Sequence, residues 1–162
     1  MTRPRRAFHA NVRWAARQVP MPEGRGKDPL PQGLSYLWLT ELWGTATGTH
    51  LGVGGFEGSI CLYGRLTRPE ATPPGNGVPL GWQDSRIVLV AADGDRLVAK
   101  VRSTGATAPP GAPDFQFIEE VSFTDGGTGR FRCAEGEAVG YVDPVKQTAV
   151  YDGWIRYGKE GG

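Results

Sequence analysis

Cysteine and histidine are scarce in this chain, and their scarcity excludes several kinds of site. Of the 162 residues, only two are cysteine and two are histidine. Cys61 and Cys133 lie far apart without the spacing of metal ligands, and two thiols are too few for a disulfide framework. We expect both thiols to be reduced, with a single bridge between them as the alternative. Because His9 and His50 are the only imidazoles, a histidine-rich metal site is excluded, and no metal is expected.

Long apolar runs and recognisable catalytic motifs are also lacking. No stretch approaches the roughly 20 apolar residues of a membrane-spanning helix, so no membrane association is expected. Arg5 and Arg6 match the start of a twin-arginine export signal, but Asn11 and Arg13 interrupt the apolar stretch that should follow. A cytoplasmic location is therefore expected. The chain has no nucleophile elbow, phosphate loop or dinucleotide fingerprint, and we expect no cofactor.

Glycine and proline, in contrast, are abundant, with 25 and 13 residues spread along the chain. They separate short apolar runs, which is typical of a single all-β domain with many turns. The expected strands cover residues 35–47, 50–66, 84–92, 95–103, 115–123, 131–142 and 147–157. The second is long enough to be split at a glycine, which gives about eight strands. We expect antiparallel neighbours and a single closed or flattened β-barrel, because closure removes exposed strand edges.

The connections between these strands fall into two kinds. Asp93-Gly94 is a strong hairpin signal, and residues 125–129, with glycine at three positions, predict a second hairpin connection. The proline-rich connections 67–83 and 104–114 are too long for tight hairpins. Such loops either line the mouth of a binding site or are passive excursions.

The first 33 residues differ from the rest of the chain in charge and composition. Residues 1–27 hold seven Lys and Arg against one Glu, a net charge of +6, and because the whole chain is +1 the remainder carries −5. An apolar stripe predicts a short helix over residues 7–19, and half of residues 20–33 are Pro or Gly. We assign residues 1–33 to a basic N-terminal arm and linker, and residues 34–162 to the barrel. The arm's alternative partners are the acidic barrel itself, another subunit of a homo-oligomer, and nucleic acid.

The glycine-rich loop within residues 123–136 carries a family resemblance. Together with Thr49-His50-Leu51-Gly52 and the final segment Trp154-Ile155-Arg156-Tyr157-Gly158, it resembles the allene oxide cyclase-like barrel family. Plant members of that family have a similar glycine loop late in the chain and an aromatic-rich last strand. The resemblance covers about residues 36–158, and dirigent-like proteins are related barrels. It implies a small barrel whose interior accommodates an apolar organic molecule.

Alternation within the expected strands points to two carboxylates in the barrel interior. One face of the strand over 115–123 is apolar except for Glu119, and one face of the strand over 35–47 is apolar except for Glu41. Burial raises the pKa of a carboxyl, which can then serve as a general acid or base. The alternatives are a structural ion pair with an arginine or exposure to solvent, and at Glu41 the opposite face is apolar too. We expect Glu119 to face inward and either to titrate above an ordinary glutamate or to meet an arginine.

The family resemblance implies further roles. It implies that Glu41 corresponds to a glutamate on the first barrel strand that polarises the substrate, and loosely that Cys61 corresponds to a cysteine on the second. Trp43 replaces the asparagine expected two residues after that glutamate, which removes the usual water-holding group. Alternation places Cys61 opposite Ile60 and Leu62, so it points outwards unless the interior is polar there. The candidate catalytic residues are Glu41, Glu119 and Cys61.

Large aromatic side chains are the candidates for ligand binding. In a small barrel they fill the interior, or they line a pocket for one flat or polyene-like ligand. The candidate ligand-binding residues are Trp43, Tyr63, Trp82, Tyr141 and Trp154. We therefore expect a barrel that binds an apolar organic molecule and, if catalytic, is a cofactor-free isomerase or cyclase that shapes its substrate in the lumen. The alternative is a non-enzymatic assembly protein whose basic arm docks on partner subunits.

Overall fold

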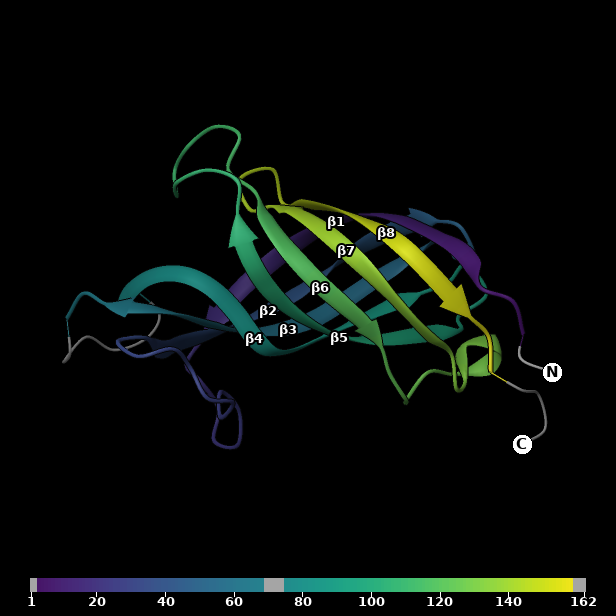
Figure 1. The fold of residues 1–162 in the computed structure, drawn as a ribbon, viewed down its shortest axis with the longest axis horizontal. Coiled ribbons are helices and arrows are strands. Elements are labelled where there is room, and N and C mark those ends of the chain that lie inside the picture. The colour runs from purple at the N-terminus through teal and green to yellow at the C-terminus, as the bar shows by residue number, and fades with distance from the viewer. Residues whose placement is uncertain (1–2, 69–74, 159–162) are drawn as a thin grey trace.

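The computed structural model describes residues 3–68 and 75–158, and in these ranges the chain is all-β (Figure 1). One short 3₁₀-helix, η1 (Gly129–Phe131), interrupts the strands. The strands are β1 (Arg6–Val19), β2 (Ser35–Gly48), β3 (Gly52–Leu66), β4 (Gly77–Val90), β5 (Arg96–Ala106), β6 (Phe117–Phe123), β7 (Glu135–Asp143) and β8 (Thr148–Arg156). Within the described ranges, no helix has the length and apolar character needed to cross a membrane.

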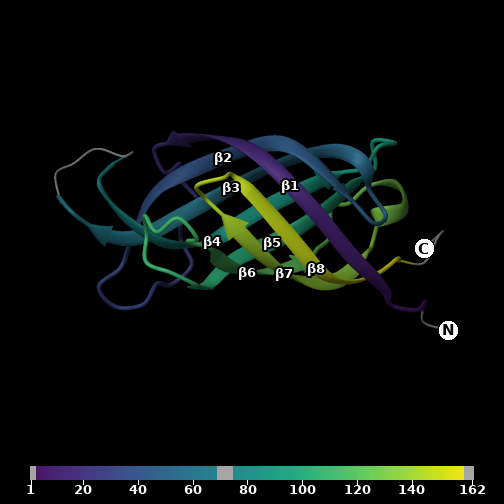
Figure 2. The same cartoon turned by 90° about the horizontal axis from the view of Figure 1, so that it is seen from above.

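The eight strands form one closed barrel in sequence order. Each strand pairs antiparallel with its neighbour along the chain, and β8 returns to pair antiparallel with β1. Figure 2 shows β1 and β8 side by side along the seam where the barrel closes. The expected eight-stranded antiparallel barrel is thus confirmed, and closure leaves neither sheet edge unpaired.

The expected helix over residues 7–19 is wrong, because these residues form strand β1. Phe8, Ala10 and Val12 alternate with polar residues, face the interior and are buried. The apolar stripe that suggested a helix is equally compatible with this period of two, and pairing with both β2 and β8 selects the strand. The barrel therefore begins at Arg6 rather than at residue 34, and residues 6–19 are not a free arm.

Several strand boundaries also differ from expectation. Strand β4 begins at Gly77, so much of the expected connection 67–83 is strand, while residues 69–74 of it lie outside the described part of the chain. Strand β7 begins at Glu135 rather than at residue 131, because Phe131 is the last residue of η1 and is fully buried. The turn at 93–94 joins β4 to β5, and the 125–129 loop lies in the connection from β6 to β7, as predicted.

The interior is filled mainly by apolar side chains that alternate with outward-facing polar ones. Its most deeply buried large members include Phe8, Ile87, Leu89, Leu97, Phe131 and Ile155. At the end where β6 begins, the ring of Phe115 packs edge-on against Phe117, with centroids 4.6 Å apart, and Phe117 packs likewise against Trp82 at 4.7 Å. The connection 107–116 thereby contributes Phe115 to the core at this end of the barrel.

Segment 20–33 is bound to the outside of the barrel at an irregularity in β4. The pairing of β3 with β4 shifts register there, and Asp84 adopts a positive φ of 51°. Arg25 donates hydrogen bonds to Ser59 Oγ at 3.0 Å and to the Asp84 carbonyl at 2.9 Å, and the Gly26 amide donates to Asp84 Oδ2 at 2.8 Å. The proline- and glycine-rich linker therefore has a defined place over β3 and β4.

Candidate functional site

Glu119 lies inside the barrel, as alternation along β6 predicts. Its side chain is on the same face as Phe117 and Val121, and only 3% of the residue is exposed. Among the described residues no Lys, Arg or His forms an ion pair with it. Of the two expected outcomes for this residue, burial without an arginine is the one found.

Trp82 of β4 is the principal hydrogen-bond partner of Glu119. Its indole Nε1–H donates to Glu119 Oε2 at 2.6 Å across the interior. The position of the indole is restrained by the Phe117 ring, and the Trp82 amide donates to Ser103 Oγ at 2.8 Å. The other carboxyl oxygen, Oε1, is buried and accepts no hydrogen bond from the part of the chain that the structure describes. An unpaired buried oxygen is costly for an ionised carboxyl, which favours its protonated form.

Tyr151 of β8 reaches the same carboxyl because the strand between them carries no side chain at the opposing position. Gly140 of β7 pairs with both Glu119 and Tyr151. A Cβ atom on Gly140 would stand 2.6 Å from the Tyr151 ring, so this ring occupies the space that a side chain would need. Glycine at position 140 thus allows a large phenol to lie beside the carboxyl, fully inside the barrel.

Burial dominates the acid–base properties of this cluster. Desolvation raises the pKa of Glu119 to about 7, although the hydrogen bond from Trp82 and the nearby Tyr151 hydroxyl oppose the shift. The Tyr151 hydroxyl acts on the carboxyl from outside regular hydrogen-bond geometry, and burial together with the nearby carboxyl raises the pKa of Tyr151 well above its ordinary value. Near neutral pH, Glu119 is therefore present in both protonation states, as a general acid or base requires.

An apolar surface adjoins the cluster at the same end of the barrel. Leu62 of β3 stands directly opposite Trp82, and Trp38 of β2 stands opposite Leu62 in the same cross-strand row. The side chains that pack on the core there while remaining partly exposed include Trp14, Leu42, Ile60 and Leu62. Two further buried polar atoms in this region, Trp38 Nε1 and Thr40 Oγ1, have no hydrogen-bond partner among the described residues. The region combines apolar surface with a few unpaired polar atoms, a composition typical of small-molecule sites.

Glu41 is not in the interior, and the expectation that it faces the lumen is wrong. Its half-exposed carboxylate lies on the outer face of β2, where Arg17 of β1 donates to it from Nε at 3.1 Å. Both faces of this strand are apolar near Glu41, and pairing places Thr40 and Leu42, rather than Glu41, on the inner face. Glu41 therefore forms the structural ion pair that was the alternative interpretation.

Cys61 points outwards, as alternation along β3 indicates, yet it is 0% exposed. The bound segment 20–33 covers it, with Arg25 and the Gly26 amide close to the thiol. Burial raises the pKa of the thiol, and the positive charge of Arg25 opposes this effect. The barrel wall thus separates Cys61 from Glu119, so the three candidate catalytic residues are not brought together.

Of the five candidate ligand-binding aromatics, Trp82 is the one that lies buried inside the barrel. Trp43 and Tyr141 are 49% and 43% exposed, so neither lines the lumen. Trp154 is also on the outer surface, with the Arg5 guanidinium 4.0 Å above its ring, and Tyr63 shares the outer face of β3 with Cys61. Ring size alone does not indicate which face of a strand carries an aromatic side chain, so it does not identify the rings inside the barrel.

Tyr151 is the member of the cluster that the list of site candidates omitted. The signal for it was weak: Tyr151 shares one face of β8 with Ala149 and Ile155, but the opposite face also carries the apolar Val150 and Trp154. No group of three or more His, Cys, Asp or Glu side chains in the described part of the chain is placed to hold a metal ion.

Comparisons with known proteins add no relative from which a role could be transferred. No family model, curated protein or solved structure matches this chain. The likeness to allene oxide cyclase-like barrels thus stays an expectation from sequence, and the functional argument depends on the geometry around Glu119.

Proposed function

We propose that this barrel binds a small apolar organic molecule at the Trp82 end of its interior, and that Glu119 exchanges a proton with it. The observation that carries the proposal is a carboxyl that is buried without an ion pair to any cation among the described residues, and this burial raises its pKa to about 7. Burying an ionisable group in an apolar interior costs free energy, so such groups are common at functional sites. The partly exposed apolar side chains at this end supply a surface that an apolar molecule would cover.

The reaction that suits this arrangement is a cofactor-free isomerisation. The ionised carboxylate takes a proton from one atom of the ligand, and the resulting acid returns it to another atom, so that no proton or electron is gained or lost overall. The apolar walls hold the ligand in a reactive conformation and exclude water. Trp82 Nε1–H stabilises the carboxylate while it is ionised.

Access to Glu119 runs through the connection 107–116. Phe115 is the buried residue of this connection, and its ring packs on Phe117, which in turn contacts Trp82. A ligand that replaces the Phe115 ring would reach Trp82 and then the carboxyl. Displacement of one loop requires less rearrangement than separation of two strands, because the strands hold a closed hydrogen-bonded ladder.

The test compares Glu119→Gln with Glu41→Gln, a matched change of a glutamate on the outer face. Apolar carbonyl compounds and polyenes are screened by quenching of tryptophan fluorescence, and each ligand that binds is followed for isomerisation by chromatography. We expect binding to both variants, with isomerisation lost only in Glu119→Gln. Wild-type protein that binds none of these ligands, or a Glu119→Gln variant that isomerises them at the wild-type rate, would contradict the proposal.

The assembly alternative has no comparable observation behind it. It depended on a free basic arm, and residues 6–19 instead form a strand of the barrel, in which residues 10–19 pair with β2 and residues 6–13 pair with β8. We therefore make no second proposal from the arm.

A further inference from the structure

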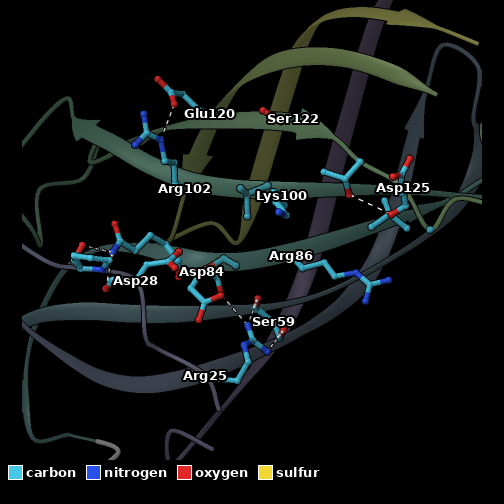
Figure 3. Close-up of a pocket in the computed structure, with 17 residues that line it drawn as sticks. Arg25, Asp28, Ser59, Asp84, Arg86, Lys100, Arg102, Glu120, Ser122 and Asp125 are labelled. Carbon is cyan, nitrogen blue, oxygen red and sulfur yellow. Dashed lines mark hydrogen bonds and ion pairs between the residues drawn. The ribbon is translucent and has the colours of Figure 1, made fainter. Parts of the chain in front are cut away.

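A concave region lies on the outside of the barrel, on the opposite side of the wall from Glu119. It is an open groove of about 960 Å³ across β3, β4, β5 and β6. Segment 20–33 forms one wall through Arg25 and Pro29, and the loop after β6 forms another (Figure 3). Its lining is largely polar and charged, in contrast to the interior.

Four residues form a continuous row across the floor of this groove. Ser59 of β3 stands opposite Arg86 of β4, Arg86 opposite Lys100 of β5, and Lys100 opposite Ser122 of β6. All four alternate with inward-facing residues and therefore point outwards. Figure 3 shows Arg86 and Lys100 between the two serines. The register thus places these four residues side by side on adjacent strands, with a serine at each end and two cationic residues between them.

The two residues at the centre of the row, Arg86 and Lys100, repel each other because both are positively charged. Like charges directly opposite each other on adjacent strands repel, and both Arg86 and Lys100 are exposed. Neither forms an ion pair with any carboxylate in the described part of the chain. The fold therefore places two cations together without neutralising them.

Two neighbouring arginines, in contrast to this pair, each form an ion pair with a carboxylate. Arg102 on the same strand donates to Glu120 at 2.7 Å, and Arg96 lies 3.2 Å from Glu57. Asp84 in the groove wall accepts the Gly26 amide. The remaining carboxylates of the lining, Asp28 and Asp125, come from the linker and from the loop after β6.

We propose that Arg86 and Lys100 bind a phosphate-type oxyanion carried by a small molecule. The two cations would donate charge-assisted hydrogen bonds to its oxygens. Ser59 Oγ already accepts a hydrogen bond from Arg25, so its own hydroxyl hydrogen remains available to donate, and Ser122 offers a second hydroxyl. The groove is larger than one phosphate group, so it accommodates the rest of a phosphorylated molecule beside the anion.

The test uses pyrophosphate as the probe and two double variants of equal charge. Arg86→Gln/Lys100→Gln removes the central pair. Arg65→Gln/Lys146→Gln removes two exposed cations that do not line the groove and form no ion pair among the described residues. Binding is measured by calorimetry at low ionic strength and near 0.15 M salt, because exposed charges are screened as salt rises.

We expect the groove variant to bind pyrophosphate at least about tenfold more weakly than wild type, since two charge-assisted contacts are lost. The control variant should keep wild-type affinity. Pyrophosphate should also raise the melting temperature of wild type and of the control, but not of the groove variant, because a ligand stabilises only a fold that binds it.

Three outcomes would overturn the proposal. The first is wild-type protein that binds no pyrophosphate at low ionic strength. The second is an equal loss of affinity in both double variants, which would indicate a general charge effect. The third is a short single-stranded oligonucleotide that displaces pyrophosphate and binds far more tightly, which would assign the groove to nucleic acid.

Discussion

At the scale of single residues, the barrel interior contains one buried carboxyl whose pKa differs from that of an ordinary glutamate. Glu119 has its pKa raised from 4.5 to about 7. A proton is thus bound more tightly in the folded state than in the unfolded state. Binding of this proton contributes about 3 kcal/mol to the free energy of unfolding. The contribution is fully present below pH 4.5 and is lost as the pH rises through about 7.

The first prediction follows from the direction of this pH dependence. Glu119→Gln cannot ionise and does not lose this contribution. As the pH rises from about 4.5 to about 8, the free energy of unfolding of Glu119→Gln should therefore increase relative to that of wild type, by about 3 kcal/mol in total. Urea unfolding of both proteins at several pH values measures the difference. Glu41→Gln is the control, because that carboxylate is on the outer face. Parallel pH curves for wild type and Glu119→Gln would show that the carboxyl is not desolvated.

The second prediction concerns Gly140, where the absence of a side chain leaves space for the Tyr151 ring. Gly140→Ala would place a Cβ 2.6 Å from the Tyr151 ring, and the ring would have to move away from Glu119. We expect a loss of stability of roughly 1–3 kcal/mol, as in other overpacked cores. Gly105→Ala is the matched control, because a Cβ there meets nothing within 4 Å. Equal denaturation midpoints for the two variants would contradict the packing argument.

At the scale of elements, segment 20–33 covers part of the barrel wall. Its conformation depends on Arg25, which bridges Ser59 of β3 and the irregular region of β4 at Asp84. Cys61 lies beneath this segment and is fully buried, whereas Cys133 is exposed. Reactivity of the Cys61 thiol therefore reports whether the segment is bound.

The third prediction uses that thiol. In a Cys133→Ser background, Arg25→Ala should release the segment and raise the rate of Cys61 labelling by at least about tenfold, since thiol reactivity follows access and thiolate character. Arg17→Ala, which removes an arginine elsewhere on the outer face, should leave the rate unchanged. Labelling with a chromogenic disulfide measures both rates. A slow, unchanged rate in Arg25→Ala would mean that other contacts hold the segment in place.

At the scale of the whole molecule, closure of the barrel depends on the first strand. β1 pairs with β2 on one side and with β8 on the other, and it contributes Phe8, Ala10 and Val12 to the core. Removing it would leave two long strand edges unpaired and expose the interior. The closed barrel should therefore fold as one cooperative unit rather than as a core with an accessory arm.

The fourth prediction is that deletion of residues 1–19 abolishes cooperative folding, whereas deletion of residues 1–4 does not. The shorter deletion stops before β1, which begins at Arg6. Far-ultraviolet circular dichroism and thermal unfolding of both truncated proteins distinguish the cases. A longer truncation that melts cooperatively like the full chain would show that seven strands suffice.

Local pattern alone was enough for the features that repeat every second residue. The strands, the inward position of Glu119 and the outward direction of Cys61 follow from alternation, because side chains in a strand point to opposite faces in turn. The local pattern was ambiguous where the apolar residues fitted both a helix and a strand, or where both faces of a strand were apolar. β1 was therefore misread as a helix and Glu41 as an interior residue, and pairing with neighbouring strands decided each case.

The remaining features join residues that are distant in sequence, so only the tertiary structure decides them. Trp82 and Tyr151 reach Glu119 from β4 and β8, and Arg25 covers Cys61 from a linker that has no regular pattern. The exposed pair of Arg86 and Lys100 exists because of strand register, and a slip of one residue would turn either side chain to the other face. Alternation specified most of the strands and most of the residues that line the interior, because a side chain buried at every second position is a local pattern. The exceptions are β1 and Glu41, for which the local pattern was ambiguous. Barrel closure, strand register and the position of segment 20–33 bring together side chains that are distant in sequence, such as those of Trp82, Tyr151 and Glu119.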